Sequence, residues 1–333
     1  MPTYNAGEFL REAIESILYQ SEQDFELIIV NDNSGDDTQA IVQSYKSDKI
    51  RYSAHSENLG APRTRNKTLD MARGEYIAIA DSDDISHPQR LAIQAGFLEN
   101  YPTVGVVGAR IRAFERKPPA FDNIPTGKVK IRLQPEQIKS RLIFNSSSAV
   151  AHAASMIRRR TLEKHRIFYN INYPVAEDFH LFQQLGLVTD MVELDATLYL
   201  YRIHSRNISK NRKIIRRYSL QTRIEFLKKK FDIDISDVFN DEGSIKSTEK
   251  FTRLAAEVEK IIETQKNNPQ YDAEILYKGG VKFLYKSLRE LENQSNDYGA
   301  VYAAYRKSKL LRRLKVNRKL RFHLKALFSP RSR

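Results

Sequence analysis

The sequence contains no cysteine among its 333 residues. Disulfide bonds, thiolate metal sites and cysteine nucleophiles are therefore excluded. No run of about 18 consecutive apolar residues occurs, so no transmembrane helix is expected, and the polar start lacks the apolar segment of a secretory signal. These absences are compatible with a cytoplasmic location. An apolar content of 41% is enough for a folded core.

Two phosphate-binding motifs are also missing. No GxGxxG follows an early strand and no GxxxxGK[ST] occurs, so neither a Rossmann dinucleotide site nor a P-loop is supported. Acidic residues are outnumbered, because Lys and Arg exceed Asp and Glu by 55 − 41 = 14. This excess suits an anionic partner such as a nucleotide or an acidic membrane surface. Because no RNA- or DNA-binding module is evident, no nucleic-acid partner is expected.

Short apolar strands alternate with amphipathic helices in the first part of the chain. Strands are expected at 27–30, 50–53, 76–80 and 104–107, and helices at 6–19, 63–73 and 88–98. This alternation predicts an open, mostly parallel α/β sheet. After a boundary near residue 210 the chain changes to long charged helices, expected at 215–230, 247–266, 271–293 and 298–327.

The chain opens with MPTYNAGEFL, in which a helix is expected to begin almost at once. Asn5 and Glu8 have the spacing of a capping box. An apolar face then follows at helical spacing, formed by Leu10, Ala13, Ile14, Ile17 and Leu18. Such a face needs a sheet on which to pack.

Acidic residues follow the predicted strands where ligands of open α/β sheets bind. Asp32 follows strand 27–30, Asp81-Ser82-Asp83-Asp84 follows strand 76–80, and Glu177-Asp178 precedes an amphipathic helix. Clustered carboxylates favour a hard cation such as Mg²⁺ or Mn²⁺. A calcium loop is the competing interpretation of DSDDISHPQRLA, but it lacks the glycine at position six and the glutamate at position twelve. A solvated acidic turn before the helix at Pro88 stays open.

Two basic side chains are weaker candidates. Arg65, at the start of helix 63–73, is placed to face a phosphate or simply lies on the surface. His204 follows an apolar strand at 198–201 and is either a ligand or a structural histidine.

Taken in order, six motifs resemble the inverting glycosyltransferases of family 2, which have the GT-A fold. They are MPTYNAGEFLREAIESIL, DFELIIVNDNSGDDT, ENLGAPRTRNKTLDMARGEYIAIADSDD, HAASMIRRR, AEDFHLFQQL and YRIHSRNIS. The resemblance covers residues 1 to about 210. It implies a Rossmann-like mixed sheet flanked by helices, with a nucleotide-sugar-binding half at 1–110 and an acceptor-binding half at 111–210. Residues 211–333 are expected to form a helical, basic C-terminal extension.

The resemblance also implies roles for individual residues. Asp178 is the expected general base, and Asp83, Asp81 and His204 are the expected ligands of Mg²⁺ or Mn²⁺. The expected donor-binding residues are Pro2, Tyr4, Asn5, Asp32, Arg65, Asp81 and Ser82, with Asp32 on the base, usually uracil or thymine.

The implied activity is metal-dependent sugar transfer, with inversion, from a UDP- or dTDP-sugar to a hydroxyl of a glycan or lipid-linked acceptor. Cell-envelope polysaccharide synthesis is the expected context. A catalytically inactive GT-A protein that binds sugar nucleotides or membrane is the alternative. Two family features are missing: an aromatic residue after the DxD region, where Ile85-Ser86-His87 stands, and the QxxRW motif of processive synthases.

The two ends of the sequence carry further expectations. In relatives PTYN ends the first strand, so most of that strand is expected to be missing here, with Met1 at its last position. The segment 307–333 is crowded with Lys and Arg and holds no acidic residue. It is typical of a helix on an anionic membrane surface, at the inner face of the membrane, or of a terminal helix docked on the protein.

Overall fold

The computed structural model describes residues 1–121, 129–145, 149–207, 211–294 and 298–312. The chain divides into two compact units. One holds residues 1–142 and 146–222, and the other holds residues 143–145 and 223–333. The first unit contains all the candidate site residues named above.

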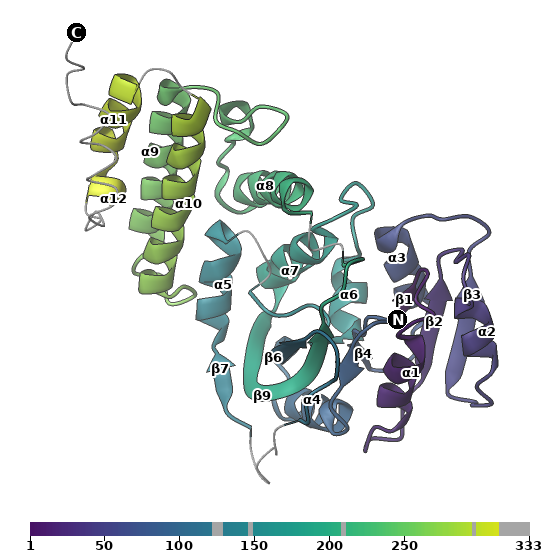
Figure 1. The fold of residues 1–333 in the computed structure, drawn as a ribbon. Helices are drawn as coiled ribbons and strands as arrows, with labels where there is room; N and C mark the ends of the chain where they lie inside the picture. Colours follow the sequence, from purple (N-terminus) through teal and green to yellow (C-terminus); the bar gives the residue numbers. More distant parts are fainter. Residues whose placement is uncertain (122–128, 146–148, 208–210, 295–297, 313–333) are drawn as a thin grey trace. The chain divides into compact units, whose positions relative to one another are not determined.

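The described part of the first unit contains two sheets (Figure 1). One is parallel with strand order β1-β2-β3, formed by β1 (Pro2–Thr3), β2 (Leu27–Asn31) and β3 (Ile50–Ala54). The other is mixed with order β4-β8-β6-β9-β5, and β7 also pairs with β9. Its strands are β4 (Tyr76–Ala78), β5 (Ile85–Ser86), β6 (Val104–Phe114), β7 (Ile131–Leu133), β8 (Met156–Arg158) and β9 (Asp190–Arg202).

Helices follow most of these strands. In the first unit they are α1 (Leu10–Leu18), α2 (Thr38–Gln43), α3 (Ala61–Met71), α4 (Arg90–Asn100), α6 (Arg159–His165) and α7 (Glu177–Val188). Two helices contribute residues to both units, α5 (Pro135–Phe144) and α8 (Arg212–Phe231). In the second unit a short 3-10 turn at Ser236–Val238 precedes α9 (Thr248–Gln265), α10 (Ala273–Gln294), α11 (Tyr298–Lys307) and α12 (Lys309–Arg312).

The expected capping box at the start of α1 is wrong. The helix begins at Leu10, and Asn5 lies outside it with a positive φ of 48°, a conformation that asparagine tolerates better than most residues. Its side-chain oxygen accepts the Gly35 N–H at 2.9 Å, and its own N–H donates to Ser34 Oγ at 2.9 Å. Asn5 therefore ties the end of β1 to the loop after β2. The predicted apolar face is buried except at Leu18, which is partly buried.

The first strand extends further than expected, because the ladder does not stop at Met1. β1 continues to Thr3, with Pro2 opposite Val30 and Thr3 opposite Asn31 in parallel register. Pro2 therefore lies in the strand, and Tyr4 is the first residue after it.

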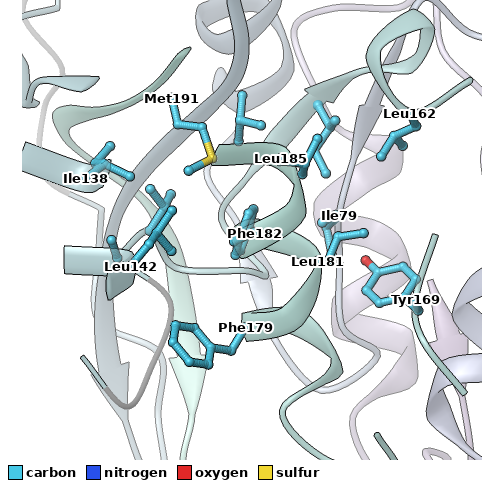
Figure 2. Close-up of a cluster of buried hydrophobic side chains, with 14 of the residues drawn as sticks. Ile79, Ile138, Leu142, Leu162, Tyr169, Phe179, Leu181, Phe182, Leu185 and Met191 are labelled. Carbon is cyan, nitrogen blue, oxygen red and sulfur yellow. The ribbon is translucent and has the colours of Figure 1, made fainter. Parts of the chain in front are cut away.

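One core cluster holds the start of α7 in position. Phe179, Leu181, Phe182 and Leu185 are at most 1% exposed, and Figure 2 shows them with Ile138, Leu142 and Met191 in the same cluster. Because α7 carries this apolar face, its first turn, with Glu177 and Asp178, is fixed relative to β4 and β8. The core therefore sets the position of the expected catalytic base.

The helices of the second unit differ from expectation at one place. A single helix was expected at 298–327, but α11 ends at Lys307, and Ser308 separates it from α12. Ser308 Oγ donates to Glu259 Oε1 of α9 at 3.1 Å, and that oxygen also accepts the Leu310 N–H. Residues 313–333, which make up most of the basic segment, lie outside the described residues. None of the described helices has the length and apolarity needed to cross a membrane.

Candidate active site

Asp32 follows β2 and is only 4% exposed. Both carboxylate oxygens accept backbone N–H groups, Oδ1 from Leu59 at 2.8 Å and Oδ2 from Gly60 at 2.9 Å. Gly60 has a φ of 84°, which a side-chain-bearing residue rarely adopts. Asp32 thus holds the loop before α3, and each of its oxygens keeps a second lone pair for a ligand.

Arg65 of α3 contacts two acidic side chains from distant parts of the chain. Its Nη2 lies 3.2 Å from Asp81 Oδ1, and its Nε lies 3.3 Å from Glu177 Oε1. Burial by itself would raise the pKa of Asp81, but the charge and hydrogen bond of Arg65, together with other nearby groups, outweigh it and hold the pKa below its usual value. Arg65 therefore joins the acidic turn after β4 to the first turn of α7.

A neutral histidine supports this arginine. His152 Nδ1 lies 3.5 Å from Arg65 Nη1, and its Nε2 lies 2.8 Å from the Tyr169 hydroxyl. Burial, with the nearby charge of Arg65, lowers the pKa of His152 to about 3. Since Arg65 can only donate, Nδ1 accepts and Nε2–H donates to Tyr169. His152 lies in the HAASM motif, but nothing in the sequence indicated that it would contact Arg65.

The acidic turn after β4 concentrates negative charge. Asp83 Oδ2 lies 2.8 Å from His204 Nε2, whereas Asp84 Oδ1 accepts the Arg202 N–H at 2.7 Å. Burial, and then the charge of Asp81, raises the pKa of Asp83. The same two causes, together with Asp83, raise the pKa of Asp84 to about 8. Among the described residues Asp84 Oδ2 has no hydrogen-bond partner.

This turn has the donors that a divalent cation prefers. In the described part of the chain no three His, Asp or Glu side chains are grouped around one point, but Asp83 and His204 are in contact with each other. Mg²⁺ commonly takes one or two carboxylates from the protein and the rest of its ligands from phosphate oxygens and water. The oxygen ligands that Asp81 and Asp83 offer in this turn, beside the His204 ring nitrogen, fit such an ion.

Two side chains that the sequence did not single out hold the turn in place. The Tyr199 hydroxyl accepts the Asp81 N–H at 3.0 Å. Arg202 Nε donates to the Asp83 carbonyl oxygen at 2.9 Å, and its guanidinium lies 4.6 Å from the ring centres of both Phe9 and Phe114. Both come from β9, which therefore sets the conformation of the acidic turn.

Asp178 follows Glu177 in the first turn of α7 and, unlike Glu177, is not within ion-pair distance of Arg65. In the described structure it has no ion-pair partner, and its Oδ1 accepts the N–H of the next residue, Phe179, at 2.7 Å. Burial raises the pKa of Asp178 above its usual value, partly opposed by Arg65. Glu177 is 8% exposed and paired with Arg65.

The remaining predicted donor residues are less constrained. Tyr4 is 55% exposed, Pro2 lies in β1, and Ser82 is partly buried in the acidic turn. Tyr4, Asn5 and Asp32 follow β1 and β2, which are neighbours in the parallel sheet, whereas Ser82 follows β4 of the mixed sheet. Direct contacts join Arg65, Asp81 and Glu177 in one group and Asp83 and His204 in another.

The fold has known counterparts. Over 92% of this chain and 90% of the other, it resembles TarS 1–349 of S. aureus in complex with UDP-GlcNAc, with a TM-score of 0.56 and 20% identity. It also resembles the mannosyltransferase PcManGT from Pyrobaculum calidifontis in complex with GDP-Man and Mn²⁺, over 97% of this chain and 81% of the other, with a TM-score of 0.53 and 16% identity. The fold is therefore the GT-A fold of nucleotide-sugar transferases.

The sequence comparisons identify the family. Residues 1–166 match the model of Glycosyl transferase family 2. An uncharacterized glycosyltransferase of Methanocaldococcus jannaschii is 33% identical over 171 residues, 49% of this chain and 56% of the relative. The succinoglycan biosynthesis protein ExoO of Rhizobium meliloti is 28% identical over 217 residues, 62% of this chain and 60% of the relative. The first half of the chain is therefore a glycosyltransferase family 2 domain, and the chain spans less than two thirds of these relatives.

Proposed function

We propose that the protein is a metal-dependent glycosyltransferase that transfers a sugar, with inversion, from a nucleotide-sugar to an acceptor hydroxyl. The observation that carries this proposal is the arrangement of acids around Arg65. One acid, Asp178, has no ion-pair partner in the described structure, while Glu177 and Asp81 are both paired with the arginine. The unpaired Asp178 carboxylate, with the acidic turn after β4 as the metal-binding element, suits a reaction in which the acceptor displaces the nucleoside diphosphate in one step.

Asp178 acts as the general base in this proposal. The acceptor oxygen attacks the anomeric carbon as its proton passes to the Asp178 carboxylate. The bond from that carbon to the phosphate oxygen breaks, and its electron pair leaves with the nucleoside diphosphate. Retention by double displacement would need a second carboxylate as nucleophile, and Glu177, next to Asp178 in the chain, is held by Arg65. Attack from the opposite face therefore inverts the anomeric configuration.

Asp83 and His204, with Asp81 close by in the chain, are the residues we assign to binding Mg²⁺ or Mn²⁺. When bound, such an ion neutralises charge that develops on the leaving diphosphate. Tyr199 and Arg202 keep the backbone of this turn fixed. PcManGT, whose structure contains Mn²⁺, supports the choice of metal.

We assign the donor base to Asp32, whose free lone pairs suit the imide N–H of uracil or thymine. Pro2, Tyr4, Asn5 and Ser82 complete the donor pocket in this proposal. The structure of TarS with UDP-GlcNAc supports a uridine donor. A UDP- or dTDP-sugar is therefore the expected donor.

The proposed setting is cell-envelope polysaccharide synthesis with a glycan or lipid-linked acceptor. A relative that takes part in succinoglycan biosynthesis supports it. The basic composition of residues 307–333 supports attachment to an anionic membrane surface, because each Lys or Arg near such a surface adds about 1 kcal/mol of attraction.

A donor screen tests the proposed activity. UDP-glucose, UDP-GlcNAc, a dTDP-sugar and GDP-mannose are each incubated with the protein and Mn²⁺ or EDTA, and nucleoside diphosphate release is measured. We expect release with a uridine or thymidine donor, loss of release with EDTA, and recovery on adding metal. Asp83→Asn should lower the rate about 100-fold or more at limiting Mn²⁺, because a metal ligand loses its charge.

Asp70→Asn is the matched control, since Asp70 is exposed on α3 away from the acidic turn. It should leave release unchanged. Equal rates with Mn²⁺ and EDTA, or an Asp83→Asn protein as active as the control, would overturn metal dependence. Thermal stabilisation by a donor without any release would instead favour a binding protein.

The pH dependence of kcat follows from the environment of Asp178. A base works only when deprotonated, and burial raises the pKa of Asp178. We therefore expect kcat to fall about tenfold per pH unit on the acid side, with a midpoint above the ordinary aspartate value of about 3.9. Initial rates between pH 4 and 9 at saturating donor measure this midpoint. A rate that stays constant down to pH 4 contradicts the assignment.

A further inference from the structure

Two apolar side chains project into solvent from the loop that follows α6. Phe168 is 60% exposed, and Ile171, three residues further along the loop, is 47% exposed. Ile167 and Tyr169, on either side of Phe168, pack against the core cluster that also holds α7. Phe168 therefore points outward because its two neighbours point inward. Single exposed apolar side chains are ordinary on protein surfaces, so this pair, the apolar tip, indicates a site only together with a second feature.

The backbone that carries the apolar tip is held in place. α6 gives way to the loop at Arg166, which has the left-handed conformation with a φ of 52° and whose N–H donates to the Glu163 carbonyl at 3.2 Å. The Asn66 side chain of α3 donates to the Tyr169 carbonyl and accepts the Tyr169 N–H, both at 2.8 Å. The loop after α6 thus lies against α3 (Figure 1). A fixed loop loses little conformational freedom when its side chains bind a partner.

Cationic side chains surround the apolar tip, and they are the second feature. Arg160 and Lys164 are exposed on α6, one turn apart on the same face, and Arg166 is exposed two residues before Phe168. Arg63 is exposed on α3, one turn before the asparagine that contacts the loop. None of these four cations has an ion-pair partner in the part of the chain that the structure describes.

The acidic side chains on the same two helices do not cancel this charge. Glu163 of α6 is paired with Arg159. Asp70 is exposed on α3, one turn after Asn66. Four unpaired cations against Asp70 leave the surface around the apolar tip positively charged.

An anionic lipid bilayer is the partner that matches both features. Its headgroups attract Lys and Arg, and its interface takes up aromatic and aliphatic side chains that project beyond the charged ones. A soluble polyanion such as a nucleic acid attracts the same cations but offers no apolar layer for Ile171. The charge and the apolar tip together therefore favour lipid.

We propose that the apolar tip and the four cations around it form a membrane-docking surface of the first unit, and that its partner is a bilayer rich in anionic lipid. This surface is separate in the sequence from the basic segment 307–333. Tyr169, next to Phe168, has its ring centre 5.8 Å from the guanidinium carbon of Arg65, so docking places the candidate active site beside the bilayer. A lipid-linked acceptor then reaches Asp178 at the membrane surface, and this last step alone rests on the proposed function.

Tryptophan fluorescence tests the surface, because the chain contains no tryptophan. Phe168→Trp introduces a single fluorophore at the apolar tip. Tyr19→Trp is the matched control, since Tyr19 is 76% exposed after α1 and has Glu15 and Glu22, instead of cations, near it in the sequence. Each protein is mixed with vesicles of phosphatidylcholine alone, or of equal parts of phosphatidylcholine and phosphatidylglycerol. Emission and quenching by acrylamide are then recorded.

We expect the emission of the Phe168→Trp protein to shift to shorter wavelength by about 10 nm, and its acrylamide quenching to fall about threefold, with the anionic vesicles only. The Tyr19→Trp protein should show neither change. Adding Arg160→Glu and Lys164→Glu to Phe168→Trp should raise the lipid concentration for a half-maximal shift about tenfold or more, because each cation near an anionic surface contributes about fivefold. The Tm should change by less than about 2 °C, since both side chains are exposed.

An unchanged emission of the Phe168→Trp protein overturns the proposal, even if the protein sediments with the anionic vesicles, because binding then belongs to another segment. Equal shifts in the Phe168→Trp and Tyr19→Trp proteins overturn it as well, since they show unspecific adsorption. An equal shift with heparin in place of vesicles assigns the surface to a soluble polyanion and rejects the lipid partner. None of these measurements needs a sugar donor, so their failure is distinct from a failure of the proposed activity.

Discussion

Replacing Asp178 with Asn should lower kcat for sugar transfer by about 10³-fold while leaving donor affinity within about threefold. General-base catalysis contributes about 10²–10⁴-fold, and the amide of Asn does not take up the acceptor proton. Asn keeps the shape of Asp and an oxygen that accepts the Phe179 N–H, which Asp178 accepts at 2.7 Å. The first turn of α7 is therefore retained, and the loss is chemical rather than structural.

Steady-state kinetics with the donor identified by the screen measure this effect, and unfolding curves check that the variant is folded. Asp70→Asn serves as the control for the substitution itself. Glu177→Gln distinguishes the contribution of Glu177 to kcat from that of Asp178. It should lower kcat less than Asp178→Asn, because Glu177 is already paired with Arg65. A larger loss in Glu177→Gln than in Asp178→Asn reassigns the base.

Some of this architecture could be predicted because it depends on local pattern. The apolar run 27–30 forms a buried strand as predicted, and Asp32 and Asp81 come just after strands, where ligands of open α/β sheets commonly bind. The apolar face of α1 was likewise readable from helical spacing. Its start was not, because Asn5 bonds to Ser34 and Gly35 instead of capping the helix.

The contacts that organise the site could not be predicted from local pattern. Arg65 lies 16 residues from Asp81 in the chain, and Glu177 comes much later, so their meeting depends on how α3 and α7 pack on the sheet. The same holds for Tyr199, whose hydroxyl accepts the Asp81 N–H across 118 residues. In an apolar strand that tyrosine is indistinguishable from an ordinary core residue.

Arg90 has a position that the sequence alone did not indicate. An arginine in the first turn of a helix after Pro88 is normally expected at the surface, yet Arg90 is 0% exposed. Its nitrogens donate to four acceptors, at 2.7–3.1 Å: the Ile79 and Ser155 carbonyls and the side chains of Ser86 and Gln94. Ile79 lies two residues before Asp81. Arg90 therefore fixes the end of β4 from beneath the acidic turn.

Replacing Arg90 with Met should destabilise the protein by about 3 kcal/mol. An unsatisfied buried acceptor costs about 1–3 kcal/mol, and four lose their donor, although relief from burying the guanidinium charge offsets part of this cost. The expected fall in Tm is about 6–12 °C, measured by thermal unfolding. The Tm of the Arg90→Lys protein should lie between the Tm values of the unaltered protein and the Arg90→Met protein. An ammonium keeps the charge but lacks the planar, multi-nitrogen geometry that reaches all four acceptors.

Arg160→Met is the matched control, because Arg160 is exposed on α6, and its Tm should change by less than about 1 °C. If Arg90 positions the acidic turn as well as stabilising it, the Arg90→Met protein assayed well below its Tm should also need more Mn²⁺ for half-maximal activity. If the Mn²⁺ dependence is unchanged while the Tm falls, Arg90 contributes to stability alone and does not position the acidic turn. A Tm equal to that of the Arg160→Met protein contradicts both roles, since it means that the four acceptors find other partners.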